Sequence, residues 1–170
     1  MRPSKGFTLI ELLLVVSITA LLGTISFPLF GVLRQKAGLA GCIGNMRLIG
    51  VSLNVYLQDH NMIWPQEPPE GFQDETDMWR WWEHTMTEYG VARKHWVCPS
   101  DAAANNDTNL GSNTFHGSYL PTPFDEYPNT AFRWKQPWLI ERAGFHGGSR
   151  GPNMLMPDGS VSEGVSMSSQ

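Results

Sequence analysis

The apolar positions of this 170-residue chain form one long run near the N-terminus and only short periodic groups after it. From Phe7 to Leu33 the sequence is apolar or weakly polar, and its single charge is Glu11. A membrane-spanning helix needs about 20 apolar residues, so this segment is long enough to cross a bilayer with some tilt. Arg2 and Lys5 precede it, which predicts a cytoplasmic N-terminus and a head on the opposite side of the membrane.

Beyond Arg34 the apolar residues change to the spacing of one helix face. The members of this stripe are Leu39, Ile43, Met46, Leu53 and Leu57. The helix is predicted to end near His60, because Pro65 prevents its continuation much further. A continuous helix from Phe7 to His60 would be about 80 Å long. Two interpretations of its internal glycines stay open, close packing between subunits or local fraying; these are Gly38, Gly41, Gly44 and Gly50.

The rest of the chain predicts a second helix and several short strands. The helix is expected at about 77–89, and Gly90 is its natural end. Strands are expected at 95–98, 118–120 and 138–143, followed by a hairpin over 153–165 that turns at Asp158 and Gly159. The predicted fold class is α+β, with a long N-terminal helix packed on a small antiparallel sheet.

Composition narrows the range of functions. Twelve Lys and Arg against sixteen Asp and Glu give a net charge of −4 with no basic run, which disfavours nucleic acid as a partner. The chain has no G-x-S-x-G, H-E-x-x-H or phosphate-loop motif, and its five histidines are scattered, so we expect no enzymatic activity. All seven tryptophans lie between positions 64 and 138, which predicts an aromatic-rich head after the apolar segment.

A secretory signal peptide is the alternative explanation of the N-terminal segment. Three features argue against it: the apolar run exceeds the usual length of a signal core, a small-x-small cleavage site is not obvious, and Glu11 lies within the run. An acid there costs about 2.5–3.5 kcal/mol on insertion scales, so it persists where a positive group meets it. Cleavage after Gly6 would create such a group, the α-amine of Phe7.

The segment Lys5-Gly6-Phe7-Thr8-Leu9-Ile10-Glu11 resembles the processing site of type IV prepilins and type II secretion pseudopilins. The resemblance covers about thirty residues closely. It implies that a prepilin peptidase cuts after Gly6 and N-methylates Phe7, and that Glu11 pairs with the N-terminus of a neighbouring subunit. Pro28 corresponds to a helix-kinking proline common in the family. Loss of the leader removes Arg2 and Lys5, which makes the mature charge −6.

The resemblance implies a non-enzymatic filament subunit of the pilin-like fold. Its expected segments are a leader (1–6), a transmembrane and assembly helix (7–33) and a periplasmic head (34–170). Its expected partners are the prepilin peptidase, other pseudopilins in a homo-oligomeric filament, and an inner-membrane assembly platform. The expected location is the bacterial inner membrane, and then a periplasmic or extracellular filament. The alternative is a type IV pilus or surface filament subunit whose head binds an adhesive or carbohydrate ligand.

Cys42 and Cys98 would plausibly pair in an oxidising periplasm, and two separate buried thiols are the alternative. Pseudopilins with long helices often carry a cysteine near this helix position and a later Cys-Pro-Ser-Asp, which is residues 98–101 here. Major adhesive pilins usually place a disulfide around a C-terminal loop instead. The cysteine positions therefore favour the pseudopilin branch.

The segment from His146 to Gly159 resembles a C-terminal element of the same bacterial group. Asn153 and Asp158 are weak candidates for oxygen ligands of calcium, and a structural role in the hairpin turn is the favoured interpretation. No other cofactor is expected. For the head, Trp79 and Trp82 are predicted to be core, while better candidates for exposed contact are Trp64, Trp81 and Trp134.

Overall fold

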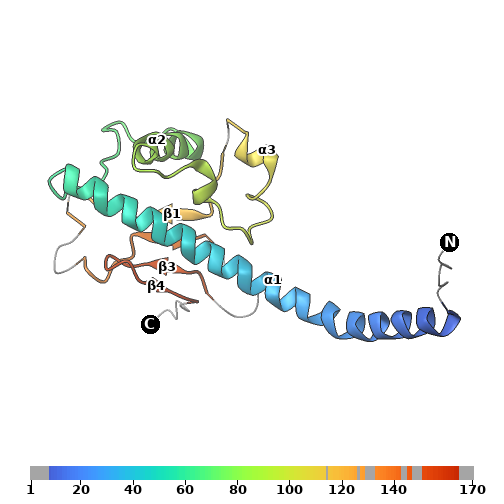
Figure 1. The fold of residues 1–170 in the computed structure, drawn as a ribbon. Coiled ribbons are helices and arrows are strands. Elements are labelled where there is room, and N and C mark those ends of the chain that lie inside the picture. Colours follow the sequence, from blue (N-terminus) through green and yellow to red (C-terminus); the bar gives the residue numbers. More distant parts are fainter. Residues whose placement is uncertain are drawn as a thin grey trace, which may run out of the picture. The chain divides into compact units, whose positions relative to one another are not determined.

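The structure is a computed structural model that describes residues 8–113, 115–125, 127–128, 133–142, 145–146 and 151–164. The chain divides into two compact units, Met1–Ala37 and Gly38–Gln170. Helix α1 runs from Leu9 to Asp59 and contributes to both (Figure 1).

In the first unit, α1 presents apolar side chains on all sides, and none of the window from Leu9 to Phe27 is buried. This window has a mean hydropathy of 2.2 and is long and apolar enough to cross a membrane. A helix that is apolar all round is typical of a membrane span. The helix passes position 28 without a break, and a kink at Pro28 remains a prediction.

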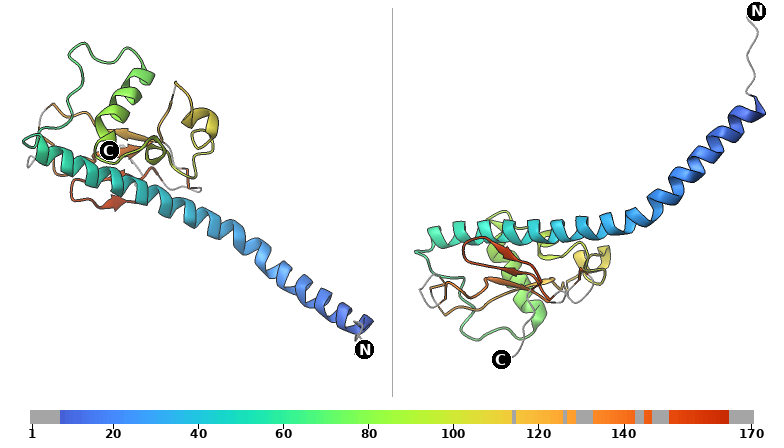
Figure 2. Two further views of the ribbon diagram at one scale, coloured as in Figure 1. Left: turned by 45° about the horizontal axis from the view of Figure 1, so that its top comes forward. Right: turned by 90° about the horizontal axis from the view of Figure 1, so that it is seen from below.

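In the second unit, the remainder of α1 packs on a four-stranded antiparallel sheet (Figure 2). The strands follow one another in the order β1 (Tyr119–Pro121), β2 (Leu139–Glu141), β3 (Met154–Leu155) and β4 (Val161–Ser162). Register is fixed by pairs such as Leu120 with Ile140 and Leu139 with Leu155. The fold is therefore the α+β, pilin-like arrangement that the sequence predicts.

The buried face of α1 differs from the predicted stripe at two positions. Met46, Leu53 and Leu57 are fully buried as expected, and Cys42 and Ile49 complete the face in place of the half-buried Leu39 and Ile43. The helix ends next to the predicted His60. Asn61 and Met62 then take positive φ angles of 54° and 64°, and the Met62 N–H returns to the Leu57 carbonyl at 2.7 Å.

The second helix, α2 (Glu75–Thr87), lies two residues earlier than predicted. Its N-cap is Asp74, whose carboxylate accepts the Asp77 N–H at 2.8 Å. After the helix, Gly90 has a φ of +84°, the left-handed conformation that favours glycine. A short helix, α3 (Asp107–Leu110), lies in the loop that precedes β1.

The predicted strand at 95–98 is wrong. Residues Arg93–Trp96 form a 3-10 helix, η1, and only Val97 is extended after it. The Ala92 N–H donates to the His95 ring Nδ1 at 3.0 Å, and the His95 N–H donates to the Ala92 carbonyl at 2.9 Å. These two local hydrogen bonds stabilise a turn, and they could not form if the segment were an extended strand.

Candidate functional site

The N-terminal end of α1 is closed by Thr8 and Glu11. The Thr8 N–H and Oγ1 both donate to Glu11 Oε2 at 2.8 Å, and Thr8 Oγ1 accepts from the Glu11 N–H at 3.3 Å. This reciprocal arrangement is a capping box, which satisfies otherwise orphaned donors at the start of a helix. The Glu11 carboxylate thus lies at the positive end of the helix dipole, and Glu11 is the fifth residue after the predicted cleavage position. Gly6 and Phe7 lie outside the described residues.

The second cluster is built around a disulfide between Cys42 of α1 and Cys98, which follows η1. The pairing left open by the sequence is therefore formed. Both cysteines are fully buried, their Cα atoms are 4.9 Å apart, and 56 positions separate them in the chain. A cross-link over a loop of this length contributes about 4 kcal/mol in the chain-entropy model.

The turn that carries Cys98 is held by buried polar groups. Asp101 Oδ1 accepts the N–H groups of Ala103 and Ala104 at 3.2 and 3.1 Å. Ser118 Oγ donates to Asp101 Oδ2 at 2.8 Å and accepts the Cys98 N–H at 2.9 Å. The position of Cys98 is therefore set by hydrogen bonds with Ser118, the residue before β1, and within its own turn, as well as by the sulfur bond.

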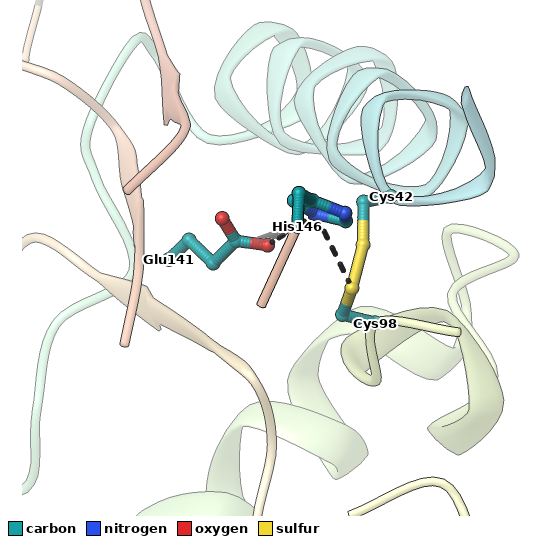
Figure 3. Close-up of side chains that lie close together, drawn as sticks. All are labelled: Cys42, Cys98, Glu141 and His146. Atoms are coloured by element: carbon teal, nitrogen blue, oxygen red, sulfur yellow. Dashed lines mark hydrogen bonds and ion pairs between the residues drawn. A yellow bond between two sulfur atoms is a disulfide. The ribbon is translucent and has the colours of Figure 1, made fainter. Parts of the chain in front are cut away.

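Glu141 and His146 lie beside the disulfide (Figure 3). The Nε2 atom of His146 is 3.2 Å from Glu141 Oε1 and 3.6 Å from Cys98 Sγ. The Glu141 side chain is fully buried and that of His146 is 6% exposed. Glu141 Oε2 also accepts the Asn153 N–H at 3.1 Å. Burial raises the pKa of the Glu141 carboxyl, against the lowering effect of the bonds from Asn153 and His146.

The two calcium candidates are not brought together around a common point. Asn153 is buried, and its carbonyl also accepts the Glu141 N–H at 2.9 Å, next to the pairing of β2 with β3. Asp158 lies exposed in the hairpin turn, where its carboxylate accepts the Ser160 N–H at 2.9 Å. Hydrogen bonds with the Ser160 side chain and with its N–H lower the pKa of Asp158. Both residues thus have structural partners, and a calcium role stays a prediction.

Five of the seven tryptophans are buried in the core. Trp79 and Trp82 are buried as predicted, but Trp64 is 1% exposed, so its predicted exposure is wrong. It packs edge-on against Trp138, Trp82 and Phe124 at centroid distances of 5.5, 6.2 and 4.9 Å. Trp134 is exposed as expected, and Trp81 is half-buried against Phe72. A groove of about 460 Å³ adjoins that pair, lined also by His84 and Arg80.

For three residues of these clusters, the sequence did not lead to a prediction of the contacts that the structure shows. The Thr8 cap could have been found, since Thr-x-x-Glu before an apolar run is the sequence pattern of a capping box. Glu141 reads only as a strand residue, because nothing in its neighbours indicates that it faces the cysteines. His146 was read with Asn153 and Asp158, whereas its ring lies against Glu141 and the disulfide.

Comparison with known proteins gives one match. Residues 1–27 match the family described as the prokaryotic N-terminal methylation motif. The chain therefore carries a prepilin-type motif, which suggests a pilin or pseudopilin subunit that is processed by a prepilin peptidase and assembles into a filament. The apolar helix that follows is consistent with a membrane-anchored prepilin. No curated protein and no solved structure matches the chain.

Proposed function

We propose that this protein is a structural subunit of a type II secretion pseudopilus. In this role it waits in the inner membrane with its head in the periplasm, is cut after Gly6, and joins a helical filament. The observation that carries the proposal is the methylation motif at 1–27, which includes most of an apolar segment, 7–33, whose single charge is Glu11. A pilin-like filament subunit acts through its surfaces, so no catalytic residue is assigned.

The surface of α1 in the head supports assembly through the helix. Leu48, Val51 and Val55 follow helical spacing and are 37%, 65% and 44% exposed, on the side away from the buried face. Apolar side chains that gather on one exposed face mark interaction surfaces. In the first unit, the exposed apolar residues of 9–33 offer a separate apolar surface to the helices of neighbouring subunits.

Two features favour a pseudopilin over a surface pilus. The disulfide joins α1 to the turn after η1 and does not enclose a C-terminal loop. Between Asp59 and Glu88 the head carries eight acidic residues and Arg80 as the one Lys or Arg. A surface of this charge repels nucleic acid, which disfavours DNA uptake.

The proposal is tested by processing and by partners in cells that contain a prepilin peptidase and a secretion system. Mass spectrometry should show a mature chain that begins with N-methylated Phe7. The mature protein should cross-link to itself and to the inner-membrane assembly platform of the secretion system. An intact Met1 start, or cleavage beyond residue 20, would contradict the prepilin assignment. Cross-linking to a type IV pilus platform alone would contradict the pseudopilus.

A ligand-binding surface filament is the second candidate, and one observation favours it. The groove beside Phe72 and Trp81 presents aromatic rings at a partly open surface, and flat indoles stack on sugar rings. Titration of the purified protein with oligosaccharides while tryptophan fluorescence is followed tests this candidate. A saturable change that Trp81→Ala removes and Trp134→Ala retains would support it.

A further inference from the structure

Four potential metal ligands converge at the disulfide, from parts of the chain far apart in sequence. They are Cys42 on α1, Cys98 after η1, Glu141 at the end of β2, and His146 beyond it (Figure 3). One ligand atom of each, two sulfurs, a carboxylate oxygen and an imidazole nitrogen, lies within 4.8 Å of all the others. The cysteine and glutamate side chains are fully buried and His146 is nearly so.

Two distances from His146 Nε2 to other potential ligand atoms are close to those of a tetrahedral zinc site. Zinc lies about 2.3 Å from thiolate sulfur and about 2.0 Å from nitrogen or oxygen, which at tetrahedral angles separates S from N by about 3.5 Å and N from O by about 3.3 Å. The structure has His146 Nε2 at 3.6 Å from Cys98 Sγ and at 3.2 Å from Glu141 Oε1. The two sulfurs must move apart to about 3.8 Å, which requires that their bond be broken.

We propose that the reduced protein binds one Zn²⁺ through Cys42, Cys98, Glu141 and His146, and that the disulfide and the zinc site are alternative states of one cross-link. A dithiol reductant supplies two electrons and two protons and becomes a disulfide, while the Cys42–Cys98 bond becomes two thiols. Zinc binding then displaces the two thiol protons to solvent. In the reverse direction a disulfide oxidant accepts the two electrons from the thiolates, the sulfur bond forms, and the zinc is released.

The chemistry of the donors selects the metal class. Two thiolates with one imidazole and one carboxylate suit zinc, whereas calcium and magnesium take oxygen ligands. The disulfide state excludes the metal, because bonded sulfurs are no longer thiolates. The cysteines leave the ribosome as thiols, so the zinc-binding form precedes the disulfide during biogenesis. Either form ties α1 to the turn after η1, so zinc would hold the head together until oxidation.

The experiment uses the full-length protein in detergent, oxidised or reduced, freed of metal and titrated with Zn²⁺ against a chromophoric chelator. We expect one Zn²⁺ per reduced chain, none at this site in the oxidised chain, and protection of both thiols from alkylation. Co²⁺ in place of Zn²⁺ should show thiolate charge-transfer bands and the intense visible bands of tetrahedral coordination. His84→Gln is the matched control, an exposed histidine on α2 outside the cluster, and should bind zinc like the wild type.

His146→Gln and Glu141→Gln separate this site from simple capture by two thiols. Each should weaken zinc binding by more than about 100-fold. Residues that only hydrogen-bond to metal ligands already change metal affinity by about 10- to 100-fold, and a direct ligand should contribute more. If the reduced chain is unfolded without metal, zinc should restore its circular dichroism spectrum in the wild type and not in the His146 variant. Equal affinity of both variants and the wild type, or no zinc bound by the reduced wild type, would overturn the proposal.

Discussion

Gly50 on α1 lies directly against Leu155 on β3, so close that a Cβ atom at position 50 would stand 2.8 Å from Leu155 Cδ2. Both residues are buried, and the Leu155 carbonyl accepts the Trp138 N–H at 2.7 Å. The glycine therefore sets the distance between the helix and the C-terminal hairpin. Gly38 and Gly41 make similar approaches to Ser100 and Pro99. Close packing within the chain explains these three glycines, an interpretation that differs from both sequence-based alternatives.

Gly50→Ala should destabilise the head. The added methyl group must displace a fully buried side chain, which costs about 1–3 kcal/mol and outweighs the gain in helix propensity. Gly44→Ala is the matched control, because Gly44 is an exposed residue of the same helix and its Cβ would meet nothing within 4 Å. The control should gain up to about 1 kcal/mol. Denaturant unfolding followed by tryptophan fluorescence measures both, and equal effects would contradict the packing argument.

The disulfide should be the largest single contributor to stability of the head. Unreduced, unfolded protein from the periplasm should show no free thiol, and Cys98→Ser should lower the free energy of unfolding by about 4 kcal/mol. The double variant Cys42→Ser/Cys98→Ser should cost about the same as either single one, since each removes the same bond. Alkylation with mass spectrometry and thermal melting check these results. Full alkylation of both thiols without reductant would exclude the bond.

Replacement of Arg93 by lysine should lower the free energy of unfolding. Its guanidinium makes a bidentate contact with Glu83 at 2.9 and 2.6 Å and donates to the Leu110 and Ser112 carbonyls at 3.0 and 2.9 Å. Lysine cannot reproduce this fork, so Arg93→Lys should cost about 1–3 kcal/mol. Arg80→Lys is the control, because the Arg80–Asp77 pair is exposed and such pairs contribute about 0–1 kcal/mol. Indistinguishable unfolding curves for the two variants would contradict this role.

Glu11 should matter for filament growth and not for folding of the head. Glu11→Ala should enter the membrane at least as well as the wild type and still be cleaved, yet give few sheared filaments. Glu11→Gln separates charge from capping, because its side-chain oxygen can still accept from Thr8 while the charge is lost. It should assemble as poorly as Glu11→Ala, whereas Thr8→Ala, which keeps the carboxylate, should assemble. Normal filaments from Glu11→Gln would contradict a role of the charge in assembly and would indicate that Glu11 acts by capping the helix.

Val51 tests the exposed face of α1. Val51→Glu should change monomer stability by less than about 0.5 kcal/mol, because the residue is 65% exposed. The same variant should lower filament yield, since it places a charge on the proposed surface between subunits. Leu53→Glu, two residues away and fully buried, should instead unfold the head. Sheared-filament yield and monomer melting temperature distinguish the two effects, and normal filaments from Val51→Glu would exclude this surface.

Much of the fold could be predicted from local signals. The long helix, α2 and the hairpin at Asp158 and Gly159 are encoded by apolar spacing, by a stop at Gly90 and by a two-residue turn. The prediction of a strand at 95–98 is wrong because His-Trp-Val-Cys is a short apolar run, and such a run does not by itself distinguish a strand from a helical turn. What decides its structure is the His95 ring, which accepts from the Ala92 N–H and closes a helical turn. The spacing of apolar residues in a sequence does not indicate a side-chain hydrogen bond of this kind.

Among the candidate sites, too, the sequence predicts those formed by neighbouring residues and misses those formed by residues far apart in the chain. The processing site and Glu11 form one contiguous motif, which is why the sequence predicts them residue by residue. The cluster at the disulfide joins Cys98 to His146 across 48 positions, and its fourth member, Glu141, looks like an ordinary strand residue. Trp64 follows the same rule in the core, since its burial depends on Trp138 and Phe124, which only the folded chain brings to it. Contacts between residues far apart in the chain produce no periodic pattern in the sequence.

The disulfide also has a mechanical consequence. In the proposed filament, tension on the N-terminal helix would enter the second compact unit at Gly38, its first residue. Four residues later it reaches Cys42 and a covalent bond to the sheet-bearing half of the head. Hydrogen bonds and apolar contacts yield one after another when a helix is peeled from its partner, whereas a sulfur–sulfur bond does not slide. The head is thus clamped at the point where extraction loads it first.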